Sequence, residues 1–155
     1  MEYQHIVVPY DTSQSAQNAL RTAFIYAQDC NAQLSVVYVA PTADFAQPAY
    51  LMANEITGMA HVTDSQLSEM EKSYKEYQRM RLSAHLEESF GFANGRYELY
   101  ILDGAPASAI TKFSHEQGCD LIVMGSRGLD AVRGALGSVS YAVLRESHCP
   151  VLVVK

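Results

Sequence analysis

Glycines, arginines and a serine lie together in the segment GSRGLDAVRGALGS, from Gly125 to Ser138. Glycine lets backbone amides approach a ligand closely, and the free N–H groups of a helix that opens at Ser138 favour an anion. Arg127 and Arg133 add fixed positive charge. The segment therefore indicates phosphate binding, and an ordinary connecting loop with Ser138 as N-cap is the alternative. Four glycines fall within thirteen residues: Gly125, Gly128, Gly134 and Gly137.

The charge of the chain is distributed unevenly around this segment. The whole chain has 11 basic and 17 acidic residues, a formal net charge of −6. From Gly125 to Lys155 there are four basic residues and two acidic ones, whereas the preceding 124 residues carry −8. An otherwise acidic chain thus concentrates positive charge beside the glycine-rich segment. The acidic total argues against a general nucleic-acid binder, whose affinity rests on many Lys and Arg contacts to phosphate.

Patterns typical of enzymes and metal sites do not stand out in the sequence. The glycine-rich segment lacks the lysine of a Walker A loop, and the histidines share no helical i, i+4 spacing. No cysteine belongs to a CxxC pair, which argues against a zinc or redox pair. Because no nucleophile is paired with a positioned base, catalysis is the weakest of the functional classes, although slow ATP hydrolysis stays open. The cysteines are Cys30, Cys119 and Cys149.

A second polar segment, Pro9-Tyr10-Asp11-Thr12, follows a short β-branched run from His5 to Val8. Asp11 has two interpretations, because its carboxylate can cap the helix that begins near Ser13 or reach a ligand. The helix itself is predicted from apolar residues at i, i+3, i+4, i+7 and i+11. These are Ala16, Ala19, Leu20, Ala23 and Ala27.

Strand-like and helix-like segments alternate along the whole chain, which predicts one α/β domain over residues 1–155 with a parallel sheet. In such sheets, ligands bind beyond the carboxyl ends of the strands, where both polar segments lie. The predicted strands are His5–Val8, Leu34–Val39, Tyr97–Leu102, Leu121–Met124 and Val151–Val154. The predicted helices begin near Ser13, Asp64, Pro106 and Ser138.

Two regions between the second and third predicted strands are a long helix and an irregular segment. The helix from Asp64 to about Phe90 has apolar residues at 3-4-3 spacing, which are Leu67, Met70, Tyr74 and Tyr77. The irregular segment from Pro41 to Thr63 follows the second strand. It is expected either to overhang the ligand site as a mobile lid or to pack on a partner subunit.

The order of these motifs resembles the universal stress protein family over almost the whole chain. The glycine-rich segment and Cys149-Pro150-Val151 are similar to that family's carboxyl-terminal signature. The opening His5–Ser13 matches its first strand, and Gly104–Ala107 and Asp120–Gly125 match its later strand–helix units. Only residues from Pro41 to about Leu67 have no clear counterpart.

The resemblance implies an open five-stranded parallel sheet of order 3-2-1-4-5 with helices on both faces, a homodimer, and ATP binding. Any Mg²⁺ would be held through the phosphates. It implies that Asp11 approaches the adenosine, that Pro9 and Tyr10 shape that wall, and that Val39 contacts the adenine. It further implies that Gly125, Arg127 and Gly128 line the ribose and phosphates. The residues implied to hold the phosphates are Gly137, Ser138 and Val139.

One spacing departs from the family's ATP-binding pattern. Eight residues, Leu129 to Leu136, separate Gly128 from Gly137 where that pattern has nine. One residue spans up to about 3.5 Å of chain, and Gly134 gives the shorter loop conformational freedom. The alternative function is therefore a nucleotide-free dimeric interaction module of the same fold.

The remaining expectations concern assembly and location. The apolar strand Val151–Val154 is predicted to pair antiparallel with its copy in a homodimer, because it would form an open sheet edge. The start of the chain shows no leader pattern and no apolar run is long enough to span a bilayer, so a cytoplasmic protein without a membrane partner is expected. The sequence does not identify a protein partner.

Overall fold

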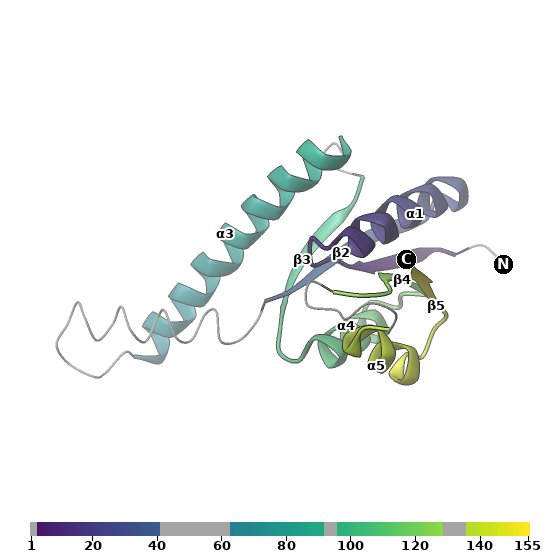
Figure 1. The fold of residues 1–155 in the computed structure, drawn as a ribbon. Coiled ribbons are helices and arrows are strands. Elements are labelled where there is room, and N and C mark those ends of the chain that lie inside the picture. Colours follow the sequence, from purple (N-terminus) through teal and green to yellow (C-terminus); the bar gives the residue numbers. More distant parts are fainter. Residues whose placement is uncertain (1–2, 41–62, 92–95, 129–135) are drawn as a thin grey trace.

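The computed structural model describes residues 3–40, 63–91, 96–128 and 136–155, and in these ranges strands and helices alternate (Figure 1). The alternation predicted from the sequence is confirmed, and the Pro41–Thr63 lid hypothesis falls, except for Thr63, outside the described residues. The elements are β1 His5–Pro9, α1 Gln14–Cys30, β2 Gln33–Ala40, α3 Asp64–Phe90, β3 Glu98–Asp103, α4 Pro106–Glu116, β4 Leu121–Gly125, α5 Ser138–Glu146 and β5 Val151–Val154.

The strands form one parallel sheet of order β3-β2-β1-β4-β5, which confirms the predicted order. β1 is the central strand, and Val7 pairs with Ser35 of β2 on one side and with Ile122 of β4 on the other. β1 and β4 are neighbours although most of the chain separates them. The segments that follow these two strands therefore meet at the same edge of the sheet.

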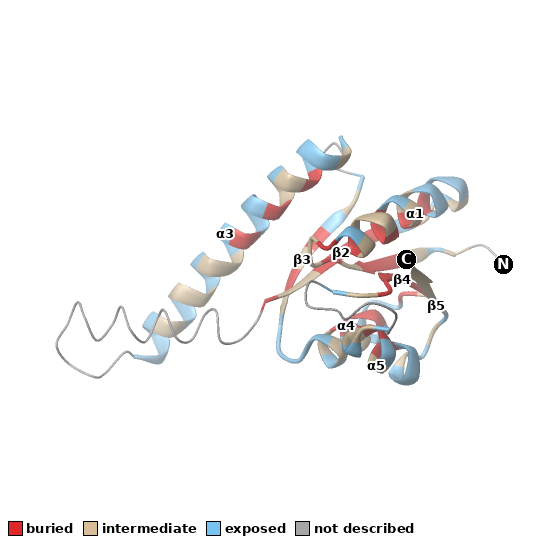
Figure 2. Ribbon diagram, in the orientation of Figure 1, coloured by how far each residue is buried: buried red, intermediate tan, exposed pale blue. Residues whose placement is uncertain are grey.

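Two apolar clusters cover the two faces of the sheet, as the buried strands in Figure 2 show. One face packs against α1 and α3, with Leu20, Leu82 and Leu86 in its core. The other packs against α4 and α5, with Ile110 and Val143 in its core. Because successive side chains of a strand point to opposite faces, the central strands are buried on both sides and read as continuous apolar runs.

Helix α1 begins directly after the N-cap residue Ser13, and its buried face is the one predicted from the apolar periodicity. Ser13 is its N-cap, and the Ser13 hydroxyl accepts a hydrogen bond from the Ala16 N–H at 3.3 Å. Its last turn ends at Asn31, which adopts the left-handed conformation (φ 53°) that often closes helices. The buried residues of α1 are the five predicted from periodicity: Ala16, Ala19, Leu20, Ala23 and Ala27.

Helix α3 has the predicted bounds but buries a different set of residues. A capping box formed by Thr63 and Gln66 starts it, and its buried residues are Gln78, Leu82 and Leu86. Tyr77, which belongs to the apolar spacing noted in the sequence, is 62% exposed. The reason is the placement of the helix, because its first half extends beyond the sheet and only its second half covers strands (Figure 1).

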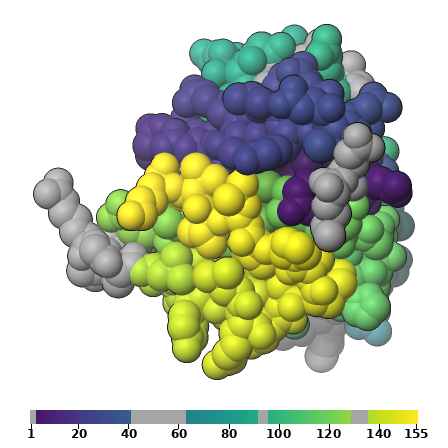
Figure 3. Space-filling model, turned by 90° about the vertical axis from the view of Figure 1, so that its right-hand side faces the viewer, coloured from purple at the N-terminus to yellow at the C-terminus, as the bar shows by residue number. Residues whose placement is uncertain are grey.

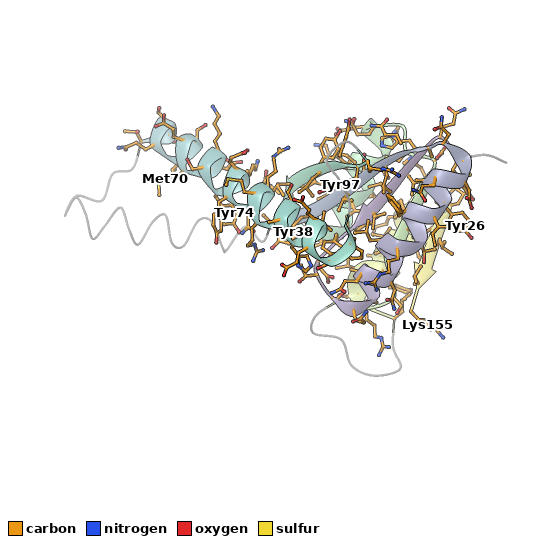
Figure 4. The ribbon with its side chains drawn as sticks, turned by 90° about the horizontal axis from the view of Figure 1, so that it is seen from above. Tyr26, Tyr38, Met70, Tyr74, Tyr97 and Lys155 are labelled. Atoms are coloured by element: carbon orange, nitrogen blue, oxygen red, sulfur yellow. The ribbon has the colours of Figure 1, made fainter. Side chains whose placement is uncertain are left out.

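Side-chain contacts hold α3 at the point where it leaves the sheet. Lys75 forms ion pairs with Asp103 at the end of β3 (2.5 Å) and with Glu71 (2.7 Å). Figure 4 shows Met70 on the part of α3 that extends outward, while Tyr74 lies closer to the sheet. No described helix is both long enough and apolar enough to cross a membrane.

Candidate functional site

Asp11 and Gly128 come together at the carboxyl edge of the sheet, beyond β1 and β4. A Cβ atom placed on Gly128 would lie 2.9 Å from Asp11 Oδ2, so a side chain at this position would enter the space beside the carboxylate. The other oxygen, Asp11 Oδ1, accepts a hydrogen bond from the Ser13 N–H at 3.0 Å. Asp11 thus supports the start of α1 with one oxygen and faces the glycine-rich segment with the other.

A tight turn between β1 and α1 fixes the direction of Asp11. Thr12 has a positive φ of 67°, which is unusual for a β-branched residue and recurs at functional sites. The Thr12 carbonyl accepts a hydrogen bond from Gln17 Nε2 at 3.1 Å, which holds this conformation. The turn therefore presents a carboxylate at the sheet edge.

Two serine hydroxyl groups, from the N-cap and the first turn of α1, bind the backbone of the glycine-rich segment. The Ser13 and Ser15 hydroxyls both donate hydrogen bonds to the carbonyl of Arg127, the former at 3.4 Å. Because Arg127 is linked through its carbonyl, its backbone position is fixed relative to Asp11. These contacts join residues more than a hundred positions apart in the sequence.

The two described ends of the glycine-rich segment are also bonded to each other. The Gly137 N–H donates to the Ser126 carbonyl at 2.8 Å, and the Ser140 hydroxyl donates to the Gly125 carbonyl at 2.8 Å. A Cβ on Gly137 would lie 3.3 Å from the Arg127 Cα, so glycine permits this close approach. Residues 129–135, with Arg133 and Gly134, lie outside the described residues.

The start of α5 offers hydrogen-bond donors at this edge. Gly137 is the N-cap of α5 and supplies no side-chain cap, whereas α1 is capped by Ser13. The first N–H groups of a helix have no partner within the helix and carry a partial positive charge. The N–H groups at the start of α5 and the exposed hydroxyl of Ser138 are therefore donors of the kind that suits an anion, close to Gly128.

A buried hydroxyl lies within the same segment. Among the described residues, Ser126 is 7% exposed and its Oγ has no hydrogen-bond partner. Buried polar groups without a partner are uncommon because they lose their contact with water. This orphaned hydroxyl and the side-chain-free space at Gly128 both fit a site for a polar ligand.

Gly125 has a packing role that the sequence did not predict. A Cβ on Gly125 would lie 2.6 Å from Ser15 Oγ and 2.8 Å from both the Ala16 N and the Ser15 backbone carbon. The first turn of α1 therefore lies directly against the end of β4. Because Gly125 is a buried residue of β4, its main contribution is to let α1 approach the sheet.

Tyr10 turns its side chain away from this edge and into the core. It is only 3% exposed, and its hydroxyl shares a hydrogen bond of 2.9 Å with His85 Nε2 of α3. Burial, reinforced by the Asp11 carboxylate, raises the pKa of Tyr10 to about 12, so the phenol is neutral at physiological pH. The Tyr10 backbone N–H bonds to the Val37 carbonyl at 2.9 Å.

The remaining predicted residues surround the site less directly. Pro9 is the last residue of β1. The side chains of Val39 and Val139 are partly buried and pack against the apolar cluster under α4 and α5. Val139 lies in the first turn of α5, where the backbone N–H groups have no partner within the helix.

Sequence reasoning missed the serines that build the site, which are Ser15, Ser126 and Ser140. A signal was present in the pair Ser13-x-Ser15 just after Asp11, but serine is common in loops and helix starts and carries little information alone. No three described His, Cys, Asp or Glu side chains are grouped so as to hold a metal ion.

Comparisons with known proteins agree on the family. The model of the universal stress protein family matches residues 2–155. Universal stress protein YxiE of Bacillus subtilis is 29% identical over 154 residues, which cover 99% of both chains. The structure of universal stress protein UspA from Lactobacillus plantarum has a TM-score of 0.71 at 24% identity, covering 100% of this chain and 99% of that one.

A further solved structure is that of a universal stress protein in complex with cAMP. It is 26% identical, has a TM-score of 0.59, and covers 100% of this chain and 98% of the other. The parallel sheet of order 3-2-1-4-5 and the match over nearly the full length lead to one conclusion. The chain belongs to the universal stress protein family.

Proposed function

We propose that this protein binds an adenine nucleotide, ATP or ADP, at the carboxyl edge of the sheet between β1, β2 and β4, and acts as a stress-response regulator in the cytoplasm. The observation that carries the proposal is the placement of the Asp11 carboxylate opposite Gly128 and beside the uncapped start of α5. A related protein supports the proposal, because a universal stress protein has been solved in complex with cAMP. The nucleotide cAMP consists of adenosine and a phosphate.

The two halves of this edge suit the two halves of a nucleotide. Asp11 Oδ2 is a hydrogen-bond acceptor, and a carboxylate at such a position recognises ribose hydroxyls. The N–H groups of α5 and the Ser138 hydroxyl are donors, and donors at a helix start recognise phosphate. Arg127 adds positive charge in an otherwise acidic chain. In this arrangement the Asp11 carboxylate binds the ribose and stays apart from the negatively charged phosphates, which the donors at the start of α5 bind.

The other proposed contacts are less specific in chemistry. Pro9 and the Tyr10 backbone form the wall beside Asp11, and Val39 is the proposed adenine contact at the end of β2. Gly125 and Gly137 contribute backbone to the phosphate side. Mg²⁺ would be bound through the phosphates of ATP, and no group of three metal-binding side chains stands at the described part of this edge.

Nucleotide content is the first measurement. Any nucleotide is extracted from the purified protein and identified by chromatography. The protein freed of nucleotide is then titrated with ATP and Mg²⁺. The chain has ten Tyr and no Trp, so a bound adenine raises the absorbance at 260 nm visibly over that at 280 nm. An empty protein that does not bind millimolar ATP would show that the eight-residue spacing closes the site.

Replacing Ser138 with alanine tests the phosphate side. A hydrogen bond to a charged group contributes roughly 1.5–3 kcal/mol, so Ser138→Ala should weaken ATP binding by about one to two orders of magnitude. The matched control is Ser68→Ala, on the exposed outer part of α3, which should leave the affinity unchanged. Equal affinities for Ser138→Ala and the parent protein would place the phosphates elsewhere.

A homodimer through β5 is the second part of the proposal, and it also underlies the alternative of a nucleotide-free interaction module. β5 is the last strand of the sheet, and all four of its residues, Val151 to Val154, are apolar and half-buried. Figure 3 shows this end of the chain in yellow on one face of the molecule, next to the purple of α1. An open apolar edge strand is a template for pairing with a second copy.

The hydrogen bonds of β5 show which of its groups face outward. The Pro150 and Val154 carbonyls accept hydrogen bonds from Ile122 and Ser126 on the β4 side, at 3.0 and 2.7 Å. Since the groups of a strand alternate in direction, the Val153 N–H points to the open edge, where a partner strand would receive it.

Val153→Pro should therefore weaken the dimer without breaking the pairing of β5 with β4, because proline removes only an outward donor. Val153→Ala keeps the donor and serves as the control. Sedimentation at micromolar concentration is the measurement, and we expect a dimer for the parent protein and for Val153→Ala. A monomeric parent protein, or a Val153→Pro dimer of unchanged affinity, would contradict pairing through β5.

A further inference from the structure

Two histidines from different elements meet on the surface where α4 and α5 end, whereas the proposed nucleotide site lies where α5 begins. His115 lies in the last turn of α4, and His148 lies between α5 and β5. Their ring centroids are 4.9 Å apart with an angle of 36° between the ring planes. Both side chains are exposed. The packing of α4 against α5, visible in Figure 1, brings these two imidazoles together.

The ring nitrogens of this pair are free to bind a ligand. Among the described residues, neither His115 nor His148 makes a side-chain hydrogen bond or an ion pair. In contrast, His5 bonds to Ser35 at 2.8 Å and His85 bonds to Tyr10 at 2.9 Å. Those two rings hold elements of the fold together through hydrogen bonds, whereas no partner in the described ranges bonds to the ring nitrogens of His115 or His148.

The ring separation suits a shared metal ion. An imidazole nitrogen binds Zn²⁺ at about 2.0–2.1 Å. Two imidazoles on one metal, at tetrahedral or square angles, then have their ring centres about 4.5–5.2 Å apart. The observed 4.9 Å lies within this range. Because both side chains are exposed, small rotations about their dihedral angles suffice to turn one nitrogen of each ring toward the ion.

We infer that His115 and His148 form a binding site for a divalent transition-metal ion of the class that prefers imidazole, represented by Zn²⁺. The described residues supply no group of three ligands, so water completes the coordination and the ion exchanges readily. Mg²⁺ and Ca²⁺ prefer oxygen ligands and are not expected to bind here. A bound ion would link the end of α4 to the segment that leads into β5.

Titration of the full-length protein with Zn²⁺ after removal of metals tests the inference. We expect His115→Asn and His148→Asn each to weaken Zn²⁺ binding by at least about tenfold, since each leaves one imidazole. The double variant should bind Zn²⁺ more weakly than either single variant, because it also removes the imidazole that each single substitution leaves. A saturating concentration of Zn²⁺ should also raise the thermal midpoint of the parent protein, and not that of either variant.

His61→Asn is the control, because it removes a histidine outside the described residues and outside the pair. It should leave the affinity for Zn²⁺ unchanged, and excess Mg²⁺ should not compete. Thermal unfolding without metal verifies that the His115 and His148 variants fold. Zn²⁺ binding that survives both substitutions, or that His61→Asn abolishes, would overturn the inference, and neither result depends on nucleotide binding.

Discussion

Replacing Gly125 with alanine is expected to lower the free energy of unfolding by about 3 kcal/mol, a large effect for one methyl group. The new Cβ would lie 2.8 Å from two backbone atoms of α1, Ala16 N and the Ser15 carbonyl carbon. Backbone atoms inside a packed helix turn do not move aside cheaply. The helix must therefore shift away from β4, and the Ser15 contact with the Arg127 carbonyl is lost with it.

Urea unfolding of Gly125→Ala and Gly128→Ala gives the measurement and its control. Among the described residues, a Cβ on Gly128 would approach only Asp11 Oδ2, at 2.9 Å, which is the end of a side chain. We therefore expect Gly128→Ala to change the free energy of unfolding by less than about 1 kcal/mol. Equal stabilities for the two variants would show that α1 does not lie against β4 as described.

Gly128→Val should abolish nucleotide binding and leave the protein folded. Its side chain would fill the space between Asp11 and the start of α5 that the proposed ribose and phosphates occupy. The backbone of Gly128 has no positive φ and the residue is exposed, so valine introduces no backbone strain. The end of the Asp11 side chain has to move aside to admit it. We therefore expect Gly125→Ala to lower the stability of the fold and Gly128→Val to abolish nucleotide binding.

Two measurements on the same sample test this contrast. ATP binding is followed by equilibrium dialysis up to millimolar concentration, and folding is followed by thermal unfolding. Ala84→Val, on an exposed position of α3, adds similar bulk away from the site and should bind ATP normally. A Gly128→Val protein that is folded and still binds ATP would show that the nucleotide does not pass between Asp11 and α5.

The strands and helices were predictable from the sequence because their signals are local, whereas the strand order was implied by the family resemblance. The buried strands appear as short β-branched runs, and each predicted strand agrees with the structure to within a residue at either end. Helix α1 was predicted down to its buried residues because the sheet lies beneath its whole length. Helix α3 was predicted in extent but not in burial, because periodicity describes a helix face and does not tell which turns have a strand below them.

The site was predictable only in part because its contacts span long stretches of sequence. The glycine-rich segment and Asp11 were found from composition, and the structure brings Asp11 and Gly128 together. The resemblance implied that Gly125 lines the ribose and phosphates and that Tyr10 shapes the wall beside Asp11. The structure adds a packing role for each residue, because Gly125 packs against α1 and the Tyr10 ring lies under α3. The hydroxyl bonds of Ser13 and Ser15 to Arg127 depend on tertiary folding, and no local pattern encodes them.

The central position of β1 has a consequence for how the protein folds during synthesis. Of the five strands described, β1 is synthesised before the others, yet one of its two neighbours is β4, and the His5 N–H bonds to an Asp120 carboxylate 115 positions later. At 5–20 residues per second, translation of that interval takes roughly 6–23 s. During this time β4 is not yet available to β1, so the edge of β1 that β4 later covers stays open to chaperones and to other chains.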